Sequence, residues 1–481
     1  MVAARAASPN LSSSWARGFQ NLPQEHDLEP LRVEGKIPAD IDGTFYRNGI
    51  GQVERAGVRY RHWFDGDGAV TAVSVTNGTA SGGVRMVRTP GFEREQRRRR
   101  PLYGGYNTPL RRPIRELFLG DRKNPANTSV LIWQGRLFAI CEAGRPFELD
   151  PRDLTTLGER DLDGVVVRAF SAHPHPSPKR RAIFGFGIKN GPTVAVTAYE
   201  LPASGNARRV AQFMVKGPLV LHDFAVTERF LIFSVPPLRM QLLPVLLRRS
   251  GPVDAMKWKG DLGTEIIVIP IAAPDAMFRV TVEAHLSEHV VNAFERGEEV
   301  CFDFTRYTTM RSLEDYVGGL IDGVVRTPLA STLSRCIVDV PKRSVRFEEL
   351  SAEPCELPRV APAKETSAHR FIYAVGFANE TSRTSGIFDA LKKFDVDRGT
   401  VETVVLGHGQ YPSEAVFIPR GGDRAGEDDG YLLTLVYDAR VDTSHVAILD
   451  ARALDAGPVA RAWFDHAIPH GFHGQWVPRG T

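Results

Sequence analysis

The most regular feature of the chain is a series of short runs of β-branched and aromatic residues, each flanked by Gly, Pro or Asp. Residues 130–142 (VLIWQGRLFAICE) fit two strands that meet at Gln134-Gly135, and residues 415–451 fit three strands joined by two polar loops. Further runs of this kind are RFLIFSV, EIIVIPI, EVCFDF, RFIYAVGF and YLLTLVY. Such a succession predicts an antiparallel meander. Helical candidates are short, the clearest lying around Ser312 to Tyr316.

The frequency of turn-forming residues supports this all-β prediction. The 481 residues include 44 Gly and 33 Pro, which favours many turns between short strands over long helices. Neither a strong internal repeat nor a Pro/Ser-rich linker divides the interior, so we expect one domain over residues 1–481. A β-propeller and a large sandwich both fit this pattern.

The overall composition excludes several classes of protein. Hydrophobic residues make up 42% and charged residues 24%, which argues against a disordered chain, a collagen-like repeat and a coiled coil. The formal net charge of +3 gives no reason to expect a polyanionic partner such as nucleic acid. The cysteines are widely spaced and form no C-x-x-C pair, so neither a disulfide framework nor a thiolate zinc site is indicated. They are Cys141, Cys301, Cys336 and Cys355.

The chain shows no targeting or membrane-spanning segment. Its first residues, MVAARAASPNLSSSWARGF, lack the apolar core of a secretion signal. No later stretch offers about 18 uncharged apolar residues, the length that a membrane span needs. We therefore expect a cytoplasmic protein.

Two local segments depart from the even charge distribution. The basic run Arg94–Pro101 (REQRRRRP) fits a solvated loop better than a nucleic-acid site, and Arg97 to Arg100 remain without an assigned role. The segment Val235–Pro252 (VPPLRMQLLPVLLRRSGP) is rich in Leu, contains internal prolines and ends near Arg248 and Arg249. It is either part of the core or an exposed apolar patch with a basic rim, the pattern of a protein that contacts a membrane surface.

The chain has 13 histidines, none of which forms H-E-x-x-H or another compact metal signature. Several nevertheless stand at the ends of apparent strands, in the strings SAHPHPSP, VLHDFAVTERFLIFSV, EHVVNAFERG and PHGFHGQWVP. Side chains at such positions can converge on the axis of a barrel or propeller. Imidazoles from four distant strands could therefore build a metal site without any short sequence motif.

These strings, together with five others, resemble the carotenoid cleavage oxygenase family. The others are FYRNGIGQ (45–52), HWFDGDGAV (62–70), PANTSV (125–130), CEAGRPFELDP (141–151) and SEAVFIPR (413–420). The resemblance runs from about Leu31 to Pro478, with the motifs in the family's order. It implies a seven-bladed β-propeller with a cap of loops and short helices over the metal face. An N-terminal extension would cover about residues 1–30, and the cap would include about residues 235–260.

The resemblance also implies a set of site residues. One iron(II) per chain would be held by four histidines, and three glutamates would stand behind three of them. The implied ligands are His173, His222, His289 and His473, and the implied glutamates are Glu142, Glu356 and Glu414. Their neighbours His175, His285 and His470 would not be ligands. Thr128 corresponds to a position near the open coordination site.

This residue set suits dioxygen chemistry. Four neutral imidazoles leave the iron its full +2 charge and also leave coordination positions open. Outer carboxylates can accept the Nδ1–H of three ligands, which turns each Nε2 toward the metal. The family uses such a site to cleave a carbon–carbon double bond with O₂ into two carbonyl products, with no external reductant.

Two branches of the family, which act on different substrates, are candidates for this chain. Cleavers of stilbenes and phenylpropenes carry a Lys before the first of these glutamates, where this chain has Cys141. Apocarotenoid cleavers resemble the chain in their Leu-rich segment after HDFAVT, through which a polyene can leave a membrane. We therefore expect an apolar apocarotenoid as substrate, cleaved to a retinal-like aldehyde. A stilbene or phenylpropene cleaver, a non-oxidative retinoid isomerase and an inactive binding propeller stay open as alternatives.

Overall fold

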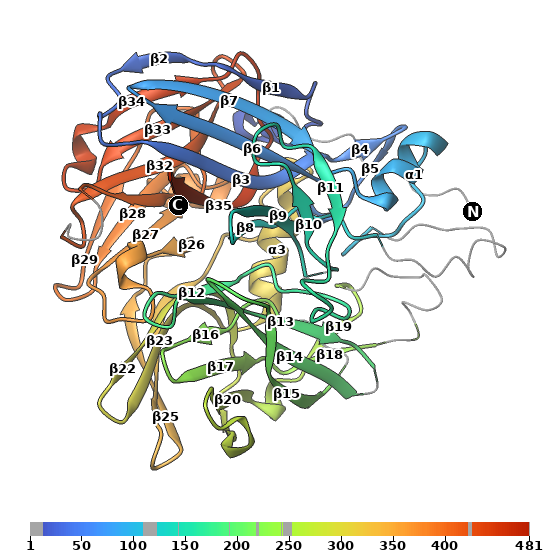
Figure 1. Ribbon diagram of the computed structural model, residues 1–481, viewed down its shortest axis with the longest axis vertical. Helices are drawn as coiled ribbons and strands as arrows, with labels where there is room; N and C mark the ends of the chain where they lie inside the picture. The colour runs from blue at the N-terminus through green and yellow to red at the C-terminus, as the bar shows by residue number, and fades with distance from the viewer. Residues whose placement is uncertain are drawn as a thin grey trace.

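The strands of this computed structural model form seven blades arranged around a central axis, with few helices (Figure 1). The structure describes residues 13–108, 123–142, 144–191, 193–217, 221–241, 243, 253–421 and 426–480. Each blade is an antiparallel sheet of four to six strands. The predicted all-β, seven-bladed propeller is therefore confirmed.

The first four blades follow the chain from its N-terminal half. Blade 1 consists of β1 (His26–Pro30), β3 (Gly43–Gln52), β6 (Asp67–Thr76), β7 (Thr79–Met86) and β35 (Gly471–Pro478). Blade 2 consists of β8 (Ser129–Trp133), β9 (Arg136–Ile140), β10 (Phe147–Leu149) and β11 (Thr156–Glu159). Blade 3 consists of β12 (His175–Ser177), β13 (Ala182–Lys189), β14 (Thr193–Pro202) and β15 (Arg208–Lys216). Blade 4 consists of β16 (Ala225–Val226), β17 (Phe230–Val235), β20 (Thr264–Pro270) and β21 (Phe278–Val282).

The remaining blades complete the ring. Blade 5 consists of β22 (Leu286–Arg296), β23 (Glu299–Tyr307), β24 (Thr332–Asp339) and β25 (Ser344–Ser351). Blade 6 consists of β26 (Cys355–Arg359), β27 (Phe371–Gly376), β28 (Ala390–Asp395) and β29 (Thr400–Val404). Blade 7 consists of β2 (Arg32–Gly35), β30 (Gln410–Pro412), β31 (Val416–Pro419), β32 (Gly430–Asp438), β33 (Thr443–Asp450) and β34 (Pro458–Trp463). Two hairpins stand apart from the blades: β4 (Glu54–Arg55) with β5 (Val58–Arg59), and β18 (Leu238–Met240) with β19 (Met256–Trp258).

The described helices are short. The α-helices are α1 (Pro90–Arg98), α3 (Met310–Leu320) and α4 (Glu380–Ser385). The 3₁₀ helices are η1 (Ser14–Gly18), η2 (Trp63–Asp65), η4 (Gly260–Leu262), η5 (Pro274–Ala276), η6 (Pro362–Lys364) and η8 (Leu454–Ala456). Among the described residues, no helix is long and apolar enough to cross a membrane.

Strands from both ends of the chain close the ring. In blade 1 the C-terminal β35 pairs with β3, so that Phe45 lies opposite Trp476. In blade 7 the N-terminal β2 pairs with β34. Both joints depend on pairing between residues more than 400 positions apart, as Figure 1 shows where the blue and red strands meet. The first and last strands are therefore integral to the propeller.

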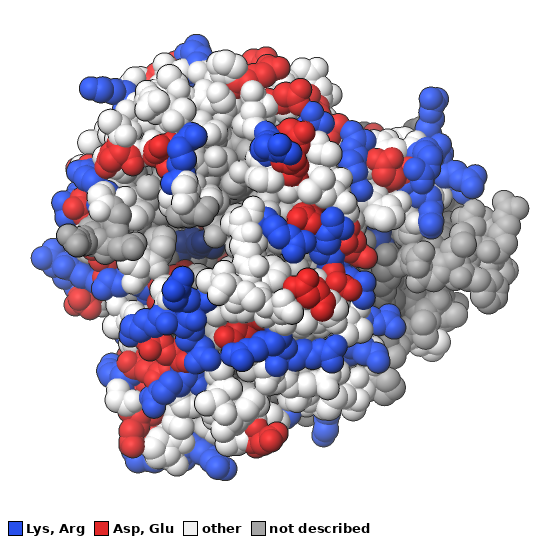
Figure 2. All heavy atoms as spheres, in the orientation of Figure 1, with Lys and Arg blue, Asp and Glu red and all other residues white. Residues whose placement is uncertain are grey.

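The core consists of apolar layers between neighbouring blades. Strands inside a blade are covered on both faces, so β32 (GYLLTLVYD) is buried along its whole length. The outer strand β25 instead alternates between exposed and half-buried positions over residues 344–348, because one of its faces is turned to solvent. Charged side chains of both signs are interspersed over the outer surface (Figure 2).

A cap packs over one end of the blades. Trp15 of η1, Trp63 of η2, Leu238 and Met256 of the β18–β19 hairpin and Tyr316 of α3 belong to one buried apolar cluster. The side chain of Thr309 caps the N-terminus of α3 by accepting from the backbone N–H of Ser312. The sequence anticipated this helix only around Ser312 to Tyr316, whereas it runs over Met310–Leu320.

The structure describes the whole of the basic run Arg94–Pro101 but only part of the segment Val235–Pro252. The first part of the basic run, from Arg94 to Arg98, belongs to helix α1 rather than to a loop, and Arg99 follows as the C-cap. Arg97 lies 3.7 Å from Glu93 one turn earlier. Cations at a helix C-terminus interact favourably with the helix dipole, which explains why this run is compatible with a helix. In Val235–Pro252, Leu238 is buried and Leu243 is 66% exposed. Residue 242 and residues 244–252 lie outside the described residues.

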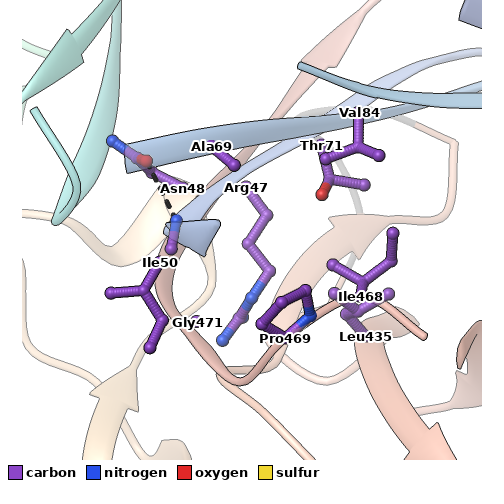
Figure 3. A pocket seen from close by; sticks show the side chains of 11 residues that line it. Arg47, Asn48, Ile50, Ala69, Thr71, Val84, Leu435, Ile468, Pro469 and Gly471 are labelled. Atoms are coloured by element: carbon purple, nitrogen blue, oxygen red, sulfur yellow. Dashed lines mark hydrogen bonds between the residues drawn. The ribbon is translucent and has the colours of Figure 1, made fainter. Parts of the chain in front are cut away.

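A buried arginine lies where blades 1 and 7 meet. The side chain of Arg47 on β3 is 2% exposed and lines a small cavity together with Thr71, Leu435 and Ile468 (Figure 3). Burial lowers the pKa of Arg47 to about 10, against the opposing attraction of Glu414. The guanidinium therefore remains charged at neutral pH. The charge of Arg47 also interacts with Glu414, the glutamate that lies against His473.

Candidate metal centre

Four histidines converge where the inner strands of the blades surround the axis. His173 lies two residues before β12, His222 lies three residues before β16, His289 lies in β22 and His473 lies in β35. These strands or their neighbours contact one another around the axis: β12 contacts β16, β16 contacts β22, and β35 contacts β8 and β31. The propeller thus brings together imidazoles that lie up to 300 residues apart in the sequence.

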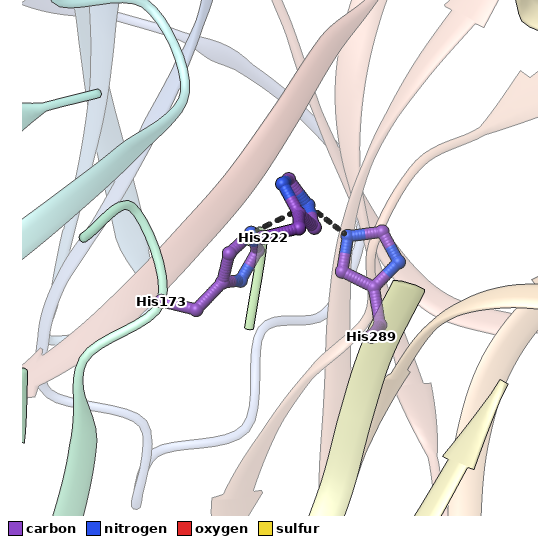
Figure 4. Close-up of side chains that lie close together, drawn as sticks. All are labelled: His173, His222 and His289. Atoms are coloured by element: carbon purple, nitrogen blue, oxygen red, sulfur yellow. Dashed lines mark hydrogen bonds between the residues drawn. The ribbon is translucent and has the colours of Figure 1, made fainter. Parts of the chain in front are cut away.

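The four rings form one compact cluster. The Nε2 atom of His222 lies 2.9 Å from Nε2 of His173 and 3.3 Å from Nε2 of His289 (Figure 4). The ring centroid of His473 lies 4.5 Å from that of His173 and 5.1 Å from that of His289. Nitrogens of three of the rings, those of His173, His222 and His289, are close enough to share one ion.

Each of the three implied glutamates lies against the Nδ1 atom of one histidine. Glu142 Oε1 is 2.6 Å from Nδ1 of His222, and Glu414 Oε1 is 2.8 Å from Nδ1 of His473. Glu356 accepts from Nδ1 of His289 in the same way. With Nδ1 donating to a carboxylate, Nε2 of each ring faces the centre of the cluster.

Further contacts fix two of these glutamates. Tyr307 donates its hydroxyl hydrogen bond to Glu356 Oε1, and the backbone N–H of Gly474 donates to Glu414 Oε2 over 2.7 Å. Burial acts to raise the pKa of Glu414, but Arg359 and the hydrogen bonds from His473 and Gly474 outweigh it and lower that pKa to about 2. The carboxylate of Glu414 is therefore ionised at any physiological pH.

The electrostatics of the cluster favour a bound cation. The Nε2 atom of His222 lies 2.9 Å from that of His173 and 3.3 Å from that of His289. Nitrogen lone pairs that face one another at these distances repel, so a positive charge between them stabilises the arrangement. Burial acts to lower the pKa of His222, yet Glu288 and Glu142 raise it to about 10, so the surroundings attract positive charge to this ring. Burial and the other histidines hold the pKa of His173 well below its ordinary range, and no carboxylate hydrogen-bonds it among the described residues. A transition metal with imidazole ligands fits this donor set.

Comparison with known proteins places the chain in a family. A family model described as retinal pigment epithelial membrane protein matches residues 19–478. The apocarotenoid-15,15'-oxygenase of Synechocystis sp. is 32% identical, over 98% of this chain and 97% of that protein. The chain belongs to the carotenoid cleavage oxygenase family.

Other members of the carotenoid cleavage oxygenase family are similar over nearly the whole chain. The carotenoid 9,10(9',10')-cleavage dioxygenase of Crocus sativus is 29% identical over 97% of this chain and 88% of its own length. The isoeugenol monooxygenase of Pseudomonas nitroreducens is 28% identical over 95% of this chain and 96% of its own length. A structure of cobalt-substituted Synechocystis apocarotenoid oxygenase superimposes with a TM-score of 0.87 at 30% identity, covering 97% of this chain and 98% of that chain.

The neighbouring histidines His175, His285 and His470 form hydrogen bonds outside the cluster. His175 Nε2 lies 2.7 Å from Asp223 Oδ1, His285 Nδ1 lies 2.9 Å from the carbonyl oxygen of Glu283, and His470 Nε2 lies 3.0 Å from that of Trp15. A ring nitrogen of each is thus engaged away from the cluster.

Thr128 lies beside His473. Its carbonyl oxygen accepts from the backbone N–H of His473 over 3.2 Å. Its hydroxyl donates to the side-chain oxygen of Asn127 over 3.0 Å. The side chain of Asn127 in turn donates to the carbonyl oxygens of Phe64 and Gly66, which ties this corner of the site to the cap.

Glu288, which is not among the predicted site residues, lies beside the cluster. Its carboxylate oxygen Oε1 is 3.7 Å from Nε2 of His222, and burial raises its pKa to about 7. In a regular strand, neighbours such as Glu288 and His289 point to opposite faces. The pairing of β22 with β23 shifts register between Ser287 and Val290, so this alternation does not hold here. The bulge itself has no signature in the sequence.

The two ends of the cluster differ in their surroundings. Toward the cap, Phe472 packs against Trp63 and Phe64, with ring centroids 4.8 and 5.4 Å away, and Phe64 contacts Tyr106. On the other side lies a cavity of about 90 Å³, bordered by three of the four histidines. Its charged lining residues include His175, Asp223, Arg359 and Glu365.

Proposed function

We propose that this chain is an iron(II) dioxygenase that cleaves a conjugated carbon–carbon double bond of an apocarotenoid with O₂, yielding two carbonyl products. The observation that carries the proposal is the cluster of four histidines with three glutamates behind them, on the axis of the propeller. The 32% identity to a protein named apocarotenoid-15,15'-oxygenase supports the choice of substrate.

In this proposal one iron per chain is held by His173, His222, His289 and His473. Bound iron(II) supplies the open coordination positions and the redox chemistry through which dioxygen reacts with an electron-rich double bond. Glu142, Glu356 and Glu414 hold the Nδ1–H of three ligands, so that each Nε2 lone pair stays directed inward. Thr128 stands beside His473, where its methyl group limits access to the metal.

The cap suits an apolar polyene. The aromatic rings of Trp63, Phe64, Tyr106 and Phe472 form a continuous set of edge and tilted contacts that ends next to His473. Such a wall offers apolar surface to a conjugated chain and excludes bulk water from the reacting double bond. The protein's own contribution is to hold one double bond of the substrate beside the metal.

Entry of this substrate from a membrane is a further part of the proposal. The exposed Leu243, in a segment that continues to Pro252 with Arg248 and Arg249, supports peripheral contact with an anionic lipid surface. We propose that residues 1–481 act as a single domain, in which loops including residues 235–260 cover the metal face. No part of this proposal requires nucleic acid.

One observation favours a second candidate, a phenolic substrate. Beside the aromatic wall, Tyr106 donates its hydroxyl to Glu314 over 3.1 Å, and His62 Nε2 lies 3.2 Å from the same carboxylate. A substrate hydroxyl could replace a member of this network. The 28% identity to a protein named isoeugenol monooxygenase is consistent with it, whereas Cys141 in place of a lysine counts against it.

Product analysis tests these proposals together. The protein would be purified without oxygen, loaded with Fe²⁺ and incubated with O₂, a panel of apocarotenals and one hydroxystilbene, followed by mass spectrometry. We expect two shorter carbonyl products from an apocarotenal. Isomerised substrate with an unchanged carbon count would identify a retinoid isomerase instead. Failure to retain iron would identify an inactive binding propeller.

A further inference from the structure

A second cluster of side chains that can bind a metal lies where blades 1 and 7 meet, away from the axis. His26 begins β1, and Asp465 and His466 follow β34. Each residue offers one ligand atom, and these atoms lie within 4.8 Å of one another. β1 is the edge strand of blade 1, on the opposite side of that sheet from β35, which carries His473. The cluster is therefore separate from the four axial histidines.

The closure of the ring brings these three residues together. His26 lies opposite Val84 of blade 1, because β1 pairs with β7. The next strand, β2, pairs with β34 of blade 7. The chain thus passes from blade 1 to blade 7 between β1 and β2 (Figure 1). As a result, His26 belongs to one blade, whereas Asp465 and His466 continue from a strand of the other.

The two imidazole rings of the cluster are stacked. Their centroids are 3.5 Å apart, and their planes are within 7° of parallel. The Nε2 atom of each ring is shielded from solvent and has no hydrogen-bond partner among the described residues. Buried polar atoms seldom lack a partner, and an unfilled ion or water site is one explanation of such an exception. Either ring can turn toward an ion without breaking a hydrogen bond at Nε2.

The carboxylate of the cluster is open to solution. Asp465 Oδ1 lies 2.6 Å from Nδ1 of His466, and the side chain of Asp465 is 85% exposed. An ion can therefore reach the cluster from outside. The side chain of His466 is only 10% exposed, and burial lowers its pKa, against the hydrogen bond with Asp465. The ring is thus neutral at pH 7 and keeps a lone pair that a metal can share.

Backbone hydrogen bonds fix both sides of the cluster. On the side of blade 7, the backbone N–H of Ser444 donates to the carbonyl oxygen of His466 over 3.0 Å. On the side of blade 1, the backbone N–H of Met86 donates to the carboxylate of Glu25, next to His26, over 2.7 Å. Ligands on rigid elements need little ordering when an ion binds.

We propose that His26, Asp465 and His466 form a binding site for a divalent transition-metal ion such as Zn²⁺, distinct from the axial centre. Two imidazole nitrogens and a carboxylate oxygen are a donor set that Zn²⁺ accepts in proteins, with a fourth position left for water. Because the ligands come from two blades, the ion would tie the first strand of the propeller to its last blade. Binding would therefore stabilise the closed ring.

Zinc titration of the iron-loaded protein tests this site. Under nitrogen, calorimetry would give the number of Zn²⁺ ions bound and their affinity, with the iron content measured before and after. We expect the wild type to bind one Zn²⁺ per chain in addition to its iron. Binding should be at least about tenfold weaker in His26→Ala and Asp465→Asn, since even the loss of an outer partner of a metal costs that much. The exposed His408→Ala is the matched control and should bind Zn²⁺ as the wild type does.

Thermal unfolding provides a second readout. Zn²⁺ should raise the melting temperature of the wild type and of the control but not that of His26→Ala, because only the folded chain holds the ligands together. Asp465→Asn keeps the test decisive if His26→Ala fails to fold, since so exposed a side chain can change without disturbing the core.

Two results would overturn the inference: equal Zn²⁺ affinity in the wild type and the folded variants, or no Zn²⁺ bound by the wild type beyond its iron. Failure of the wild type to retain iron would count against the axial centre alone, because the two sites share no residue. His26→Ala would in that case still bind one Zn²⁺ fewer than the wild type.

Discussion

The residues on either side of His473 along strand β35 lie in very different surroundings. Phe472 precedes His473 on β35 and packs against the aromatic residues of the cap, whereas Gly474 and Gln475 follow it and border the polar cavity. The cavity also carries His175, Asp223, Arg359 and Glu365. An apolar polyene would lose little by entering the first environment and would leave charged groups poorly solvated in the second. The comparison therefore favours the cap end as the side for the proposed apolar substrate, and the cavity end as the source of electrostatic support for the histidines.

Replacing His473 should have the largest effect, because it contacts both environments. His473→Ala is expected to abolish iron binding and activity together, since a ligand and the partner of Glu414 are both lost. Iron content per chain and apocarotenal turnover are the measurements. The exposed His408→Ala serves as the matched control and should retain both. Retention of iron or of activity by His473→Ala would refute the ligand assignment.

Glu414 tests the cavity end. Glu414→Gln should weaken iron retention about 10- to 100-fold, the usual cost of losing an outer partner, while circular dichroism shows an intact fold. The pKa of Glu414 is lowered from 4.5 to about 2 in the folded protein. Its contribution to stability is therefore complete above pH 4.5 and is lost as the pH falls toward 2. Acid unfolding followed from pH 5 to 2 should lose that dependence in the variant; unchanged iron content would remove Glu414 from the site.

Tyr106 tests the cap end and separates the two candidate substrates. Tyr106→Phe removes the hydroxyl that donates to Glu314 but keeps the aromatic ring. We expect kcat/KM for an apocarotenal to stay close to the wild-type value. For a hydroxystilbene it should fall about tenfold, the effect of one hydrogen bond to a charged group. Equal changes for both substrates would show that the hydroxyl does not discriminate between them.

Arg359 gives a finer test of the electrostatic support. It lies 3.8 Å from Glu414 and helps to lower the pKa of that carboxylate. Arg359→Gln should raise the pKa of Glu414, so iron should be released at a higher pH than from the wild type. The midpoint of iron loss across an acid titration measures this shift. A shift to lower pH, or none, would show that Arg359 does not support the carboxylate.

The sequence predicted the convergence of the histidines far better than their surroundings. Strand runs such as RFLIFSV sufficed for the all-β prediction, since they reflect local patterning. The choice of a seven-bladed propeller over a sandwich came from the resemblance of the motifs to the family. Glu288 was not found, because a β-bulge rather than residue type turns its carboxylate inward. The contact between Tyr106 and Glu314 joins positions 208 residues apart, which no local pattern encodes. The basic run was assigned to a loop because its charge pattern carried more weight than the Thr89 cap and Pro90 that begin helix α1.

The smallest expected effect concerns the proposed membrane contact of the segment Val235–Pro252. Leu243 is 66% exposed, so Leu243→Ser should change stability by no more than about 0.5 kcal/mol. If this residue contacts lipid, binding to anionic liposomes should nevertheless fall measurably, and more so when Leu242 and Leu246 are replaced as well. Val459→Ser is the control, because Val459 is 37% exposed on β34 of blade 7, outside this segment. Equal losses of liposome binding in both variants would mean that exposed apolar residues contribute without regard to position. A loss of stability that matches the loss of binding would return the segment to the core. A selective loss at Leu243 would instead support the proposed contact of this segment with a membrane surface, because only a local contact makes one exposed apolar residue matter more than another.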